Sequence, residues 1–218
     1  MKLLSKISAV LFPPRCVLCD SLLEEEGADI CPTCSTAARI FLHHPWKINH
    51  VKSWFALWQY GSAVRNSLVR YKFHNRRSYC RTYGRELAKK LPDWKIDYDV
   101  ISWIPVSRLR KITRGYDQVE LVAEVLCREL GQCPQRLLHK WKHNRKQSTI
   151  RGLEGRQKNV QGVYRMMPGV DVKGKRILLV EDIVTTGATV SEAASVLKAA
   201  GAKEVHVICL AVANKYHN

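Results

Sequence analysis

Residues 177–190 read Ile-Leu-Leu-Val-Glu-Asp-Ile-Val-Thr-Thr-Gly-Ala-Thr-Val, and they predict a strand, a turn and a helix in succession. The four apolar residues at 177–180 predict a buried parallel strand, with Glu181 and Asp182 at its end. The small, hydroxyl-rich turn at 185–189 leads into an amphipathic helix, whose N-terminus favours an anion. Two acids beside such an anion cradle suit the vicinal hydroxyls of a sugar. The stretch therefore predicts a site for a ribose that carries a 5′-phosphate.

The same stretch resembles the motif with which type I phosphoribosyltransferases bind 5-phosphoribosyl 1-pyrophosphate (PRPP). The resemblance implies that Glu181 and Asp182 hold the ribose 2′- and 3′-hydroxyls. It also implies a turn that wraps the 5′-phosphate, made of Thr185, Thr186, Gly187, Ala188 and Thr189. The alternative is a buried strand and a well-capped helix with two solvated acids between them. We favour the ligand site, because pattern, order and context agree and neither of the two common glycine-rich phosphate loops fits this stretch.

Length and charge narrow the class of protein. The chain has 218 residues, which suits one medium-sized domain and a small appendage. Its formal net charge is +17, and a basic surface attracts polyanions such as a diphosphate ester or a nucleic-acid backbone. The apolar N-terminal segment is interrupted by Ser and Lys and meets Pro13 and Pro14 instead of a cleavage site. No apolar run reaches the length of a membrane span, so we expect a cytoplasmic protein without membrane insertion.

Half of the cysteines form two close pairs, Cys16-x-x-Cys19 and Cys31-x-x-Cys34. Each pair can place two thiolates on one side of a turn, and two pairs complete the tetrahedral shell of a structural Zn²⁺ ion. A redox pair or two disulfides are the alternatives. A segment this small cannot bury a core of its own, and a metal would supply the missing folding energy. We therefore predict a zinc-binding appendage over residues 1–45 and a main domain over residues 46–218.

Strands and helices alternate in the main domain. Strands are expected over residues 100–104, 177–180 and 204–211, and helices over residues 62–69, 83–91, 120–130 and from about 190 to 200. The aromatic-rich segment 54–61 predicts a further strand, in a hairpin that flanks the core. The alternation implies right-handed crossovers and a parallel sheet. The predicted fold class is α/β, a type I phosphoribosyltransferase-like parallel sheet flanked by helices, with a zinc-ribbon-like appendage at the N-terminus.

The order of motifs along the chain resembles that of the ComF family (ComFC and GntX-like proteins). The series runs from the four cysteines through Tyr71-Lys-Phe73, Ile104-Pro-Val-Ser-Arg-Leu-Arg110 and Arg114-Gly-Tyr-Asp-Gln118. It continues with Gln147, Arg156 and Asn159-Val-Gln-Gly-Val-Tyr164, and the PRPP motif is its last member. One departure is Asp117, where the resemblance leads us to expect Asn. The departure puts one local hydrogen bond in question.

The resemblance also implies a pyrophosphate loop after the strand at 100–104. Its residues are Pro105, Val106, Ser107 and Arg108, with Arg114 nearby. Backbone donors and cations suit a diphosphate, although a solvated basic face is the alternative for the arginines. Residues 139–162 have many cations and little apolar periodicity, which predicts a mobile lid or a disordered segment without function. The contacts expected from a lid are Gln147, Arg156 and Asn159, and Mg²⁺ is expected with PRPP.

Three functions are consistent with the sequence. The ComF resemblance implies a PRPP-binding protein in DNA uptake during natural transformation, with single-stranded DNA and the uptake machinery as further partners. The second function is an active phosphoribosyltransferase, whose nucleobase acceptor would need a hood from residues 35–60 or from the cysteine segment. The third is a single-stranded nucleic-acid-binding protein, in which cations alternate with aromatic residues such as Tyr71, Phe73 and Trp141. No known nucleic-acid-binding motif accompanies them.

Overall fold

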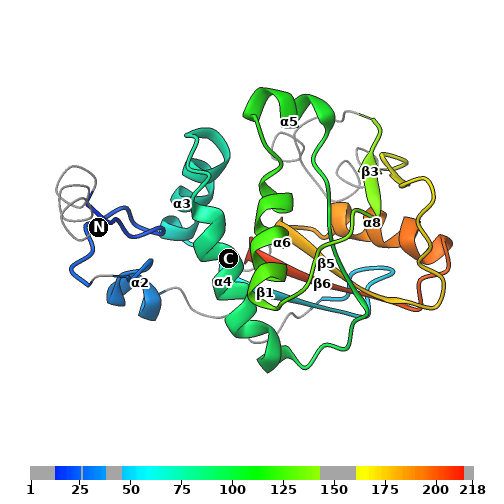
Figure 1. The fold of residues 1–218 in the computed structure, drawn as a ribbon, viewed down its shortest axis with the longest axis horizontal. Helices are drawn as coiled ribbons and strands as arrows, with labels where there is room; N and C mark the ends of the chain where they lie inside the picture. Colours follow the sequence, from blue (N-terminus) through cyan, green and yellow to red (C-terminus); the bar gives the residue numbers. More distant parts are fainter. Residues whose placement is uncertain (1–12, 26, 38–45, 143–160, 214–218) are drawn as a thin grey trace.

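The structure is a computed structural model that describes residues 13–25, 27–37, 46–142 and 161–213. The elements in these ranges follow in the order shown in Figure 1: α2 (Pro32–Ala37), β1 (Ser53–Gln59), α3 (Ser62–Phe73), α4 (Tyr79–Lys90), the 3-10 helix η1 (Leu91–Trp94), β2 (Val100–Trp103), α5 (Arg108–Arg114), α6 (Gln118–Glu129), β3 (Leu138–Lys140), β4 (Tyr164–Met166), β5 (Arg176–Val184), α8 (Ala188–Ala199) and β6 (Glu204–Val212).

Four strands form the main sheet in the order β1-β6-β5-β2, and every neighbouring pair is parallel. In the centre, β5 pairs with β6 from Arg176↔Glu204 to Val184↔Val212. Because all strands point the same way, their carboxyl ends meet at one edge, where ligands bind in sheets of this kind. The connections from β2 to α5 and from β5 to α8 both begin at this edge. The predicted α/β class with a parallel sheet is confirmed.

Strand β1 corrects one prediction. Residues 54–61 are expected in a flanking hairpin, but β1 is an edge strand of the main sheet and pairs in parallel with β6. Ala56, Leu57 and Trp58 are all buried, since both faces of the strand are covered. An apolar run of this kind predicts a strand but does not identify the neighbour with which it pairs.

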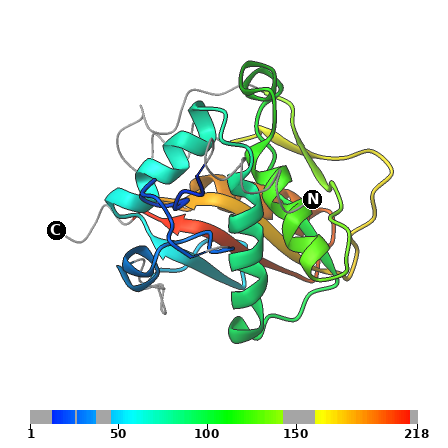
Figure 2. The ribbon, with the colours of Figure 1, turned by 60° about the vertical axis from the view of Figure 1, so that its left-hand side comes forward.

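Helices cover both faces of the sheet (Figures 1 and 2). On one face, α3, α4 and α6 supply Leu68, Leu87 and Leu126 to a core that includes Leu178 of β5. On the other face, α8 and the antiparallel β3–β4 hairpin pack over Leu179 and its neighbours. A single layer of strands therefore separates two apolar cores.

The cysteine segment packs against the first of these cores. Cys16 and Leu18 are completely buried and belong to the same apolar cluster as Leu68 of α3. Two side chains of α3 hold the backbone between the first two cysteines. Ser67 Oγ donates to the carbonyl oxygen of Val17 at 2.5 Å, and Arg70 Nη2 donates to that of Leu18 at 2.8 Å. The described part of the appendage is therefore docked on the main domain.

Candidate functional site

Glu181 and Asp182 lie inside β5, because the strand continues past the predicted residues 177–180 and ends at Val184. Neighbouring side chains of a regular strand alternate between the two faces of a sheet. Here Asp182 and Ile183 both face the α3–α6 layer, whereas Glu181 and Val184 face the α8 layer. This break in alternation lies at the carboxyl edge of the sheet. The break lies between Asp182 and Ile183, whereas Glu181 and Asp182 follow the regular alternation and are turned toward different groups of neighbours.

Asp182 is held by two side chains from the α3–α6 layer. Lys72 Nζ, from the last turn of α3, lies 2.8 Å from Asp182 Oδ2. Gln118 Nε2, from the first turn of α6, donates to the same oxygen at 2.7 Å. The side chains of Lys72 and Asp182 are only 16% and 10% exposed, so this is an ion pair shielded from solvent. Charge-assisted contacts of this kind fix the position of a carboxylate.

The two acids differ in their proton affinity. Burial raises the pKa of Glu181 well above that of an ordinary glutamate, and the neighbouring Asp182 raises it further. Burial acts on Asp182 in the same direction, but Lys72 and Gln118 outweigh burial and lower the pKa of Asp182. The raised pKa favours the neutral form of Glu181, which can donate a hydrogen bond, and the lowered pKa favours the carboxylate form of Asp182, which accepts. Such a pair matches a vicinal diol, whose hydroxyls can do both.

Basic side chains surround the acids from several elements. Lys140 of β3 lies 3.5 Å from the hydroxyl of Tyr164, and burial lowers the pKa of Lys140 to about 8, with a smaller contribution from Arg110. Burial also lowers the pKa of Arg110, which interacts electrostatically with Tyr164 and Asp182. Together with Lys72, these groups give the neighbourhood of the acids an excess of positive charge. The site is therefore suited to an anion that also carries hydroxyl groups.

The threonine-rich turn connects β5 to α8 and requires glycine at its centre. Gly187 has φ +76° at the position that precedes α8. A Cβ atom on residue 187 would lie 2.9 Å from Cγ1 of Ile48, so the contact and the backbone both exclude a larger residue. The first turn of α8 contains no acid, and Thr186 Oγ1 accepts from the backbone N–H of Ala188 at 3.4 Å. This helix start has the composition of an anion site.

The predicted pyrophosphate loop follows β2 at the same edge of the sheet. Pro105 and Ser107 are buried, Val106 is half-buried, and Ser107 Oγ accepts from the backbone N–H at the first turn of α5. Arg108 is exposed at the start of α5. Arg114, at the end of α5, donates to Gln118 Oε1 and lies 5.2 Å from the ring centroid of Phe73. Of the two predicted arginines, Arg114 is thus linked through Gln118 to Asp182.

Asp117 stands where the family resemblance leads us to expect Asn, and the structure shows which hydrogen bonds its side chain makes. Its carboxylate accepts from the backbone N–H groups of Val106 at 3.0 Å, Val119 at 3.0 Å and Glu120 at 3.2 Å. It therefore caps α6 and also fixes the loop after β2. A carboxylate performs both tasks without needing the amide group of Asn.

The predicted lid contacts Gln147, Arg156 and Asn159 lie outside the described residues. The hairpin strands on either side of that segment are described, and they pair in antiparallel fashion from Leu138↔Met166 to Lys140↔Tyr164. The hairpin thereby brings Lys140 and Tyr164 to the side of Glu181.

Four residues of the site were not assigned to it from the sequence: Lys72, Arg110, Gln118 and Lys140. Three of them, Lys72, Arg110 and Gln118, lie within motifs that carry the family resemblance, a signal that could have identified them. Their distance along the chain from Asp182 hides the contacts, because only the folded chain brings α3 and α6 to β5.

The four paired cysteines form a second site. Their Sγ atoms all lie within 4.8 Å of one another. The Sγ atoms of Cys19 and Cys31 are 3.7 Å apart, close to the roughly 3.8 Å expected across a tetrahedral zinc–thiolate shell. The backbone N–H of Cys31 also points to the Sγ atom of Cys16 at 3.4 Å. The donor set and its spacing fit Zn²⁺.

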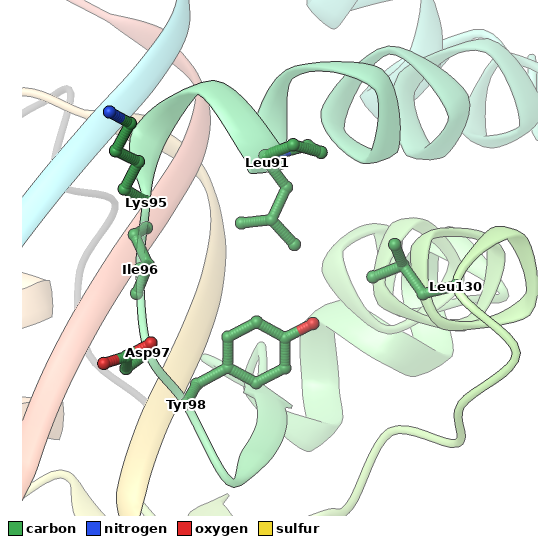
Figure 3. A pocket seen from close by; sticks show the side chains of 7 residues that line it. Leu91, Lys95, Ile96, Asp97, Tyr98 and Leu130 are labelled. Carbon is green, nitrogen blue, oxygen red and sulfur yellow. The ribbon is translucent and has the colours of Figure 1, made fainter.

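One hollow lies at the opposite edge of the sheet. Its volume is about 330 Å³, and its lining includes Leu91, Tyr98 and Leu130, whose side chains face one another in Figure 3. Lys95 and Asp97 line its rim and turn away from the centre. Tyr98 lies two residues before the start of β2, so the hollow is remote from the carboxyl edge that carries the acids.

Two family models match stretches of this chain. Residues 120–217 match the family model of the phosphoribosyl transferase domain, and residues 7–46 match that of the double zinc ribbon domain. Competence protein ComFC of Streptococcus pneumoniae is 27% identical over 203 residues, which are 89% of this chain and 86% of the relative. Competence protein F of Haemophilus influenzae is 28% identical over 66% of each chain. DNA utilization protein YhgH of Escherichia coli is 31% identical over 51% of this chain and 48% of the relative.

Solved structures show a more distant likeness. The glutamine PRPP amidotransferase of B. subtilis is 25% identical, with a TM-score of 0.41 over 64% of this chain and 30% of that one. TT1426 of Thermus thermophilus is 18% identical, with a TM-score of 0.38 over 64% of this chain and 86% of that one. Among the described residues, no helix combines the length and the apolar character needed to cross a membrane.

Proposed function

We propose that this chain is a ComF-family protein and that it binds PRPP at the carboxyl edge of its sheet. Glu181 and Asp182 bind the ribose diol, and residues 185–189 bind the 5′-phosphate. The loop at residues 105–108 and Arg114 receive the diphosphate. One observation carries the proposal: a buried pair of unequal acids stands directly before a glycine turn that opens a helix.

The charges around the acids support a diphosphate ester over a neutral sugar. Lys72, Arg110 and Lys140 lie in or next to the site, and an anion with several negative charges would balance them. We expect Mg²⁺ to enter with the diphosphate and to neutralise part of its charge. Residues of the segment 143–160, including Gln147, Arg156 and Asn159, are proposed to close over the bound ligand.

The test is thermal unfolding of the zinc-loaded chain with PRPP and Mg²⁺. At a ligand concentration of 100 times the dissociation constant, binding adds about 2.7 kcal/mol, or roughly 5–10 °C of melting temperature for a chain of this size. Asp182→Ala should abolish the shift. Asp97→Ala is the matched control, because Asp97 is an exposed acid at the opposite edge of the sheet. A wild-type chain that shows no shift would contradict the proposal.

We further propose that the chain acts in the cytoplasm in DNA uptake, as the names of its competence and DNA utilization relatives suggest. The net charge of +17 supports contact with single-stranded DNA. Such binding should weaken steeply with salt, by about 10³-fold or more between 50 and 200 mM if six or more phosphates are contacted. DNA binding that does not change with salt would contradict contact with the phosphate backbone of the DNA.

Residues 1–45 are proposed as the zinc unit, and residues 46–218 as the PRPP-binding unit.

Transfer of the phosphoribosyl group is a second candidate, favoured by the match to the phosphoribosyl transferase domain. In this reaction the bond from C1 to the diphosphate breaks, and an acceptor nitrogen forms the new bond to C1. Positive charge near the loop at 105–108 would stabilise the departing diphosphate. Release of pyrophosphate in the presence of one acceptor from a full nucleobase panel would support this candidate, and no release with any acceptor would count against it.

A further inference from the structure

Lys72 contacts one member of the acid pair, Asp182, although it belongs to none of the segments that form the proposed PRPP site. It is the penultimate residue of α3, and its ammonium lies 2.8 Å from Asp182 Oδ2. Its side chain is 16% exposed, unlike Lys89, which is 70% exposed in a comparable ion pair with Glu86. A lysine that only improves solubility would not be placed here.

The residues on either side hold Lys72 in this position. The hydroxyl of Tyr71 is completely buried and donates to the carbonyl oxygen of Gln118 at 2.7 Å. On the other side, the ring of Phe73 lies 5.2 Å from the guanidinium of Arg114. The end of α3 is therefore fixed to the start of α6 and to the end of α5. Lys72 therefore lies beside Asp182, and its neighbour Phe73 contacts Arg114, a residue proposed for the diphosphate.

A buried ion pair alone contributes little to stability, because removing two charges from water costs about as much as their attraction returns. A ligand diol must also share the oxygen of Asp182 that Lys72 now contacts. The lysine ammonium has three donors on a flexible stem, so it can turn toward a second anion and keep contact with the first. The pair is thus suited to exchange one anionic partner for another.

We propose that Lys72 determines specificity for the diphosphate group of the ligand. In the unliganded chain its ammonium neutralises Asp182, and on binding it donates to a diphosphate oxygen while the ribose diol takes its place on the carboxylate. This inference rests on the proposed PRPP site and assigns Lys72 to one part of the ligand. Lys72 thus has a different role from the groups that are proposed to bind the ribose and the 5′-phosphate.

The test compares PRPP with ribose 5-phosphate, which lacks the diphosphate, by titration calorimetry at pH 8 with Mg²⁺. Lys72→Met should lower PRPP affinity by about 10-fold or more, the effect of losing one charge-assisted hydrogen bond. Its affinity for ribose 5-phosphate should not fall, because the competitor for Asp182 is gone. Lys72→Arg should retain more PRPP affinity than Lys72→Met, and Lys89→Met should bind both ligands as the wild type does.

The outcomes separate this inference from the function on which it rests. Equal losses for both ligands in Lys72→Met would overturn it, because Lys72 would then serve only to support Asp182. A wild-type chain that does not bind PRPP would overturn the proposed function and the inference together. If Lys72→Met does not fold, Lys72→Gln carries the same comparison, since its amide can still donate to Asp182 without a charge.

Discussion

At the scale of single residues, the site depends on a difference between two adjacent acids. Glu181 and Asp182 are equally buried in β5, yet burial raises the pKa of Glu181, while Lys72 and Gln118 keep that of Asp182 low. The sequence predicts two acids and cannot predict this difference, since it arises from side chains more than 60 positions away along the chain. The charge state of each acid is therefore a property of the fold.

Lys140 gives a prediction about pH. Its pKa of about 8 in the folded chain means that it loses its proton between pH 7 and 9, and a bound anion would favour the protonated form. PRPP affinity should be constant below about pH 7 and should fall above pH 8, by up to roughly 10-fold per pH unit. Titration calorimetry at several pH values measures the PRPP affinity of the wild type and of Lys140→Arg. The affinity of the variant should not fall, because arginine keeps its charge over this pH range. The same fall in Lys140→Arg would contradict the assignment to Lys140.

Lys140 also predicts a conflict between stability and binding. Its folded pKa lies below the unfolded value of 10.5, so its charged form is disfavoured by folding. The free-energy cost of burying the charged lysine is fully present below about pH 8 and disappears as the pH rises toward 10.5. Lys140→Met should therefore raise the melting temperature at pH 7 and lower PRPP affinity. Thermal unfolding at pH 7 and pH 10 checks the sign, and a variant less stable than the wild type at pH 7 would contradict it.

At the scale of elements, the connection between β5 and α8 was predictable because all of its parts are contiguous in the sequence. The strand, the acids, the glycine and the helix follow within residues 177–190. The partners of an element were less predictable. The segment 54–61 was identified as a strand, but its parallel pairing with β6 depends on residues some 150 positions away. Local pattern indicates the element, whereas long-range packing decides its neighbours.

Gly187 provides a prediction at this connection. Gly187→Ala introduces a Cβ 2.9 Å from Ile48 into a backbone with φ +76°, and both effects destabilise the folded chain. Gly169→Ala is a matched control, because Gly169 has φ +75° and no atom within 4 Å of an added Cβ. Strain alone should cost each variant about 1–2 kcal/mol, and the clash should cost Gly187→Ala about 1–3 kcal/mol more. Equal melting temperatures for the two variants would show that Ile48 does not restrict residue 187.

At the scale of the whole molecule, the cysteine segment and the main domain share one apolar core. Two α3 side chains, Ser67 and Arg70, hold the backbone between Cys16 and Cys19, and the same helix carries Lys72 at its end. The cysteine spacing predicts the metal site, but it does not predict this docking. Loss of the metal should therefore destabilise the main domain as well as the appendage.

Cys16→Ser tests this connection. The variant should lose bound zinc, measured by elemental analysis, and should unfold at a temperature several degrees below the wild type, because metal binding supplies folding energy. Cys133→Ser is the control, since Cys133 is exposed and lies outside the cysteine cluster. Unchanged metal content and melting temperature in Cys16→Ser would contradict a structural role for the four cysteines.

Binding of PRPP through the two acids at this edge of the sheet can be measured by titration calorimetry of the folded, zinc-loaded chain with PRPP and Mg²⁺. We expect saturable binding of one ligand per chain, which Asp182→Asn abolishes and Asp97→Asn leaves intact. Heats in the wild type that do not exceed dilution, or equal binding by wild type and Asp182→Asn, would contradict it.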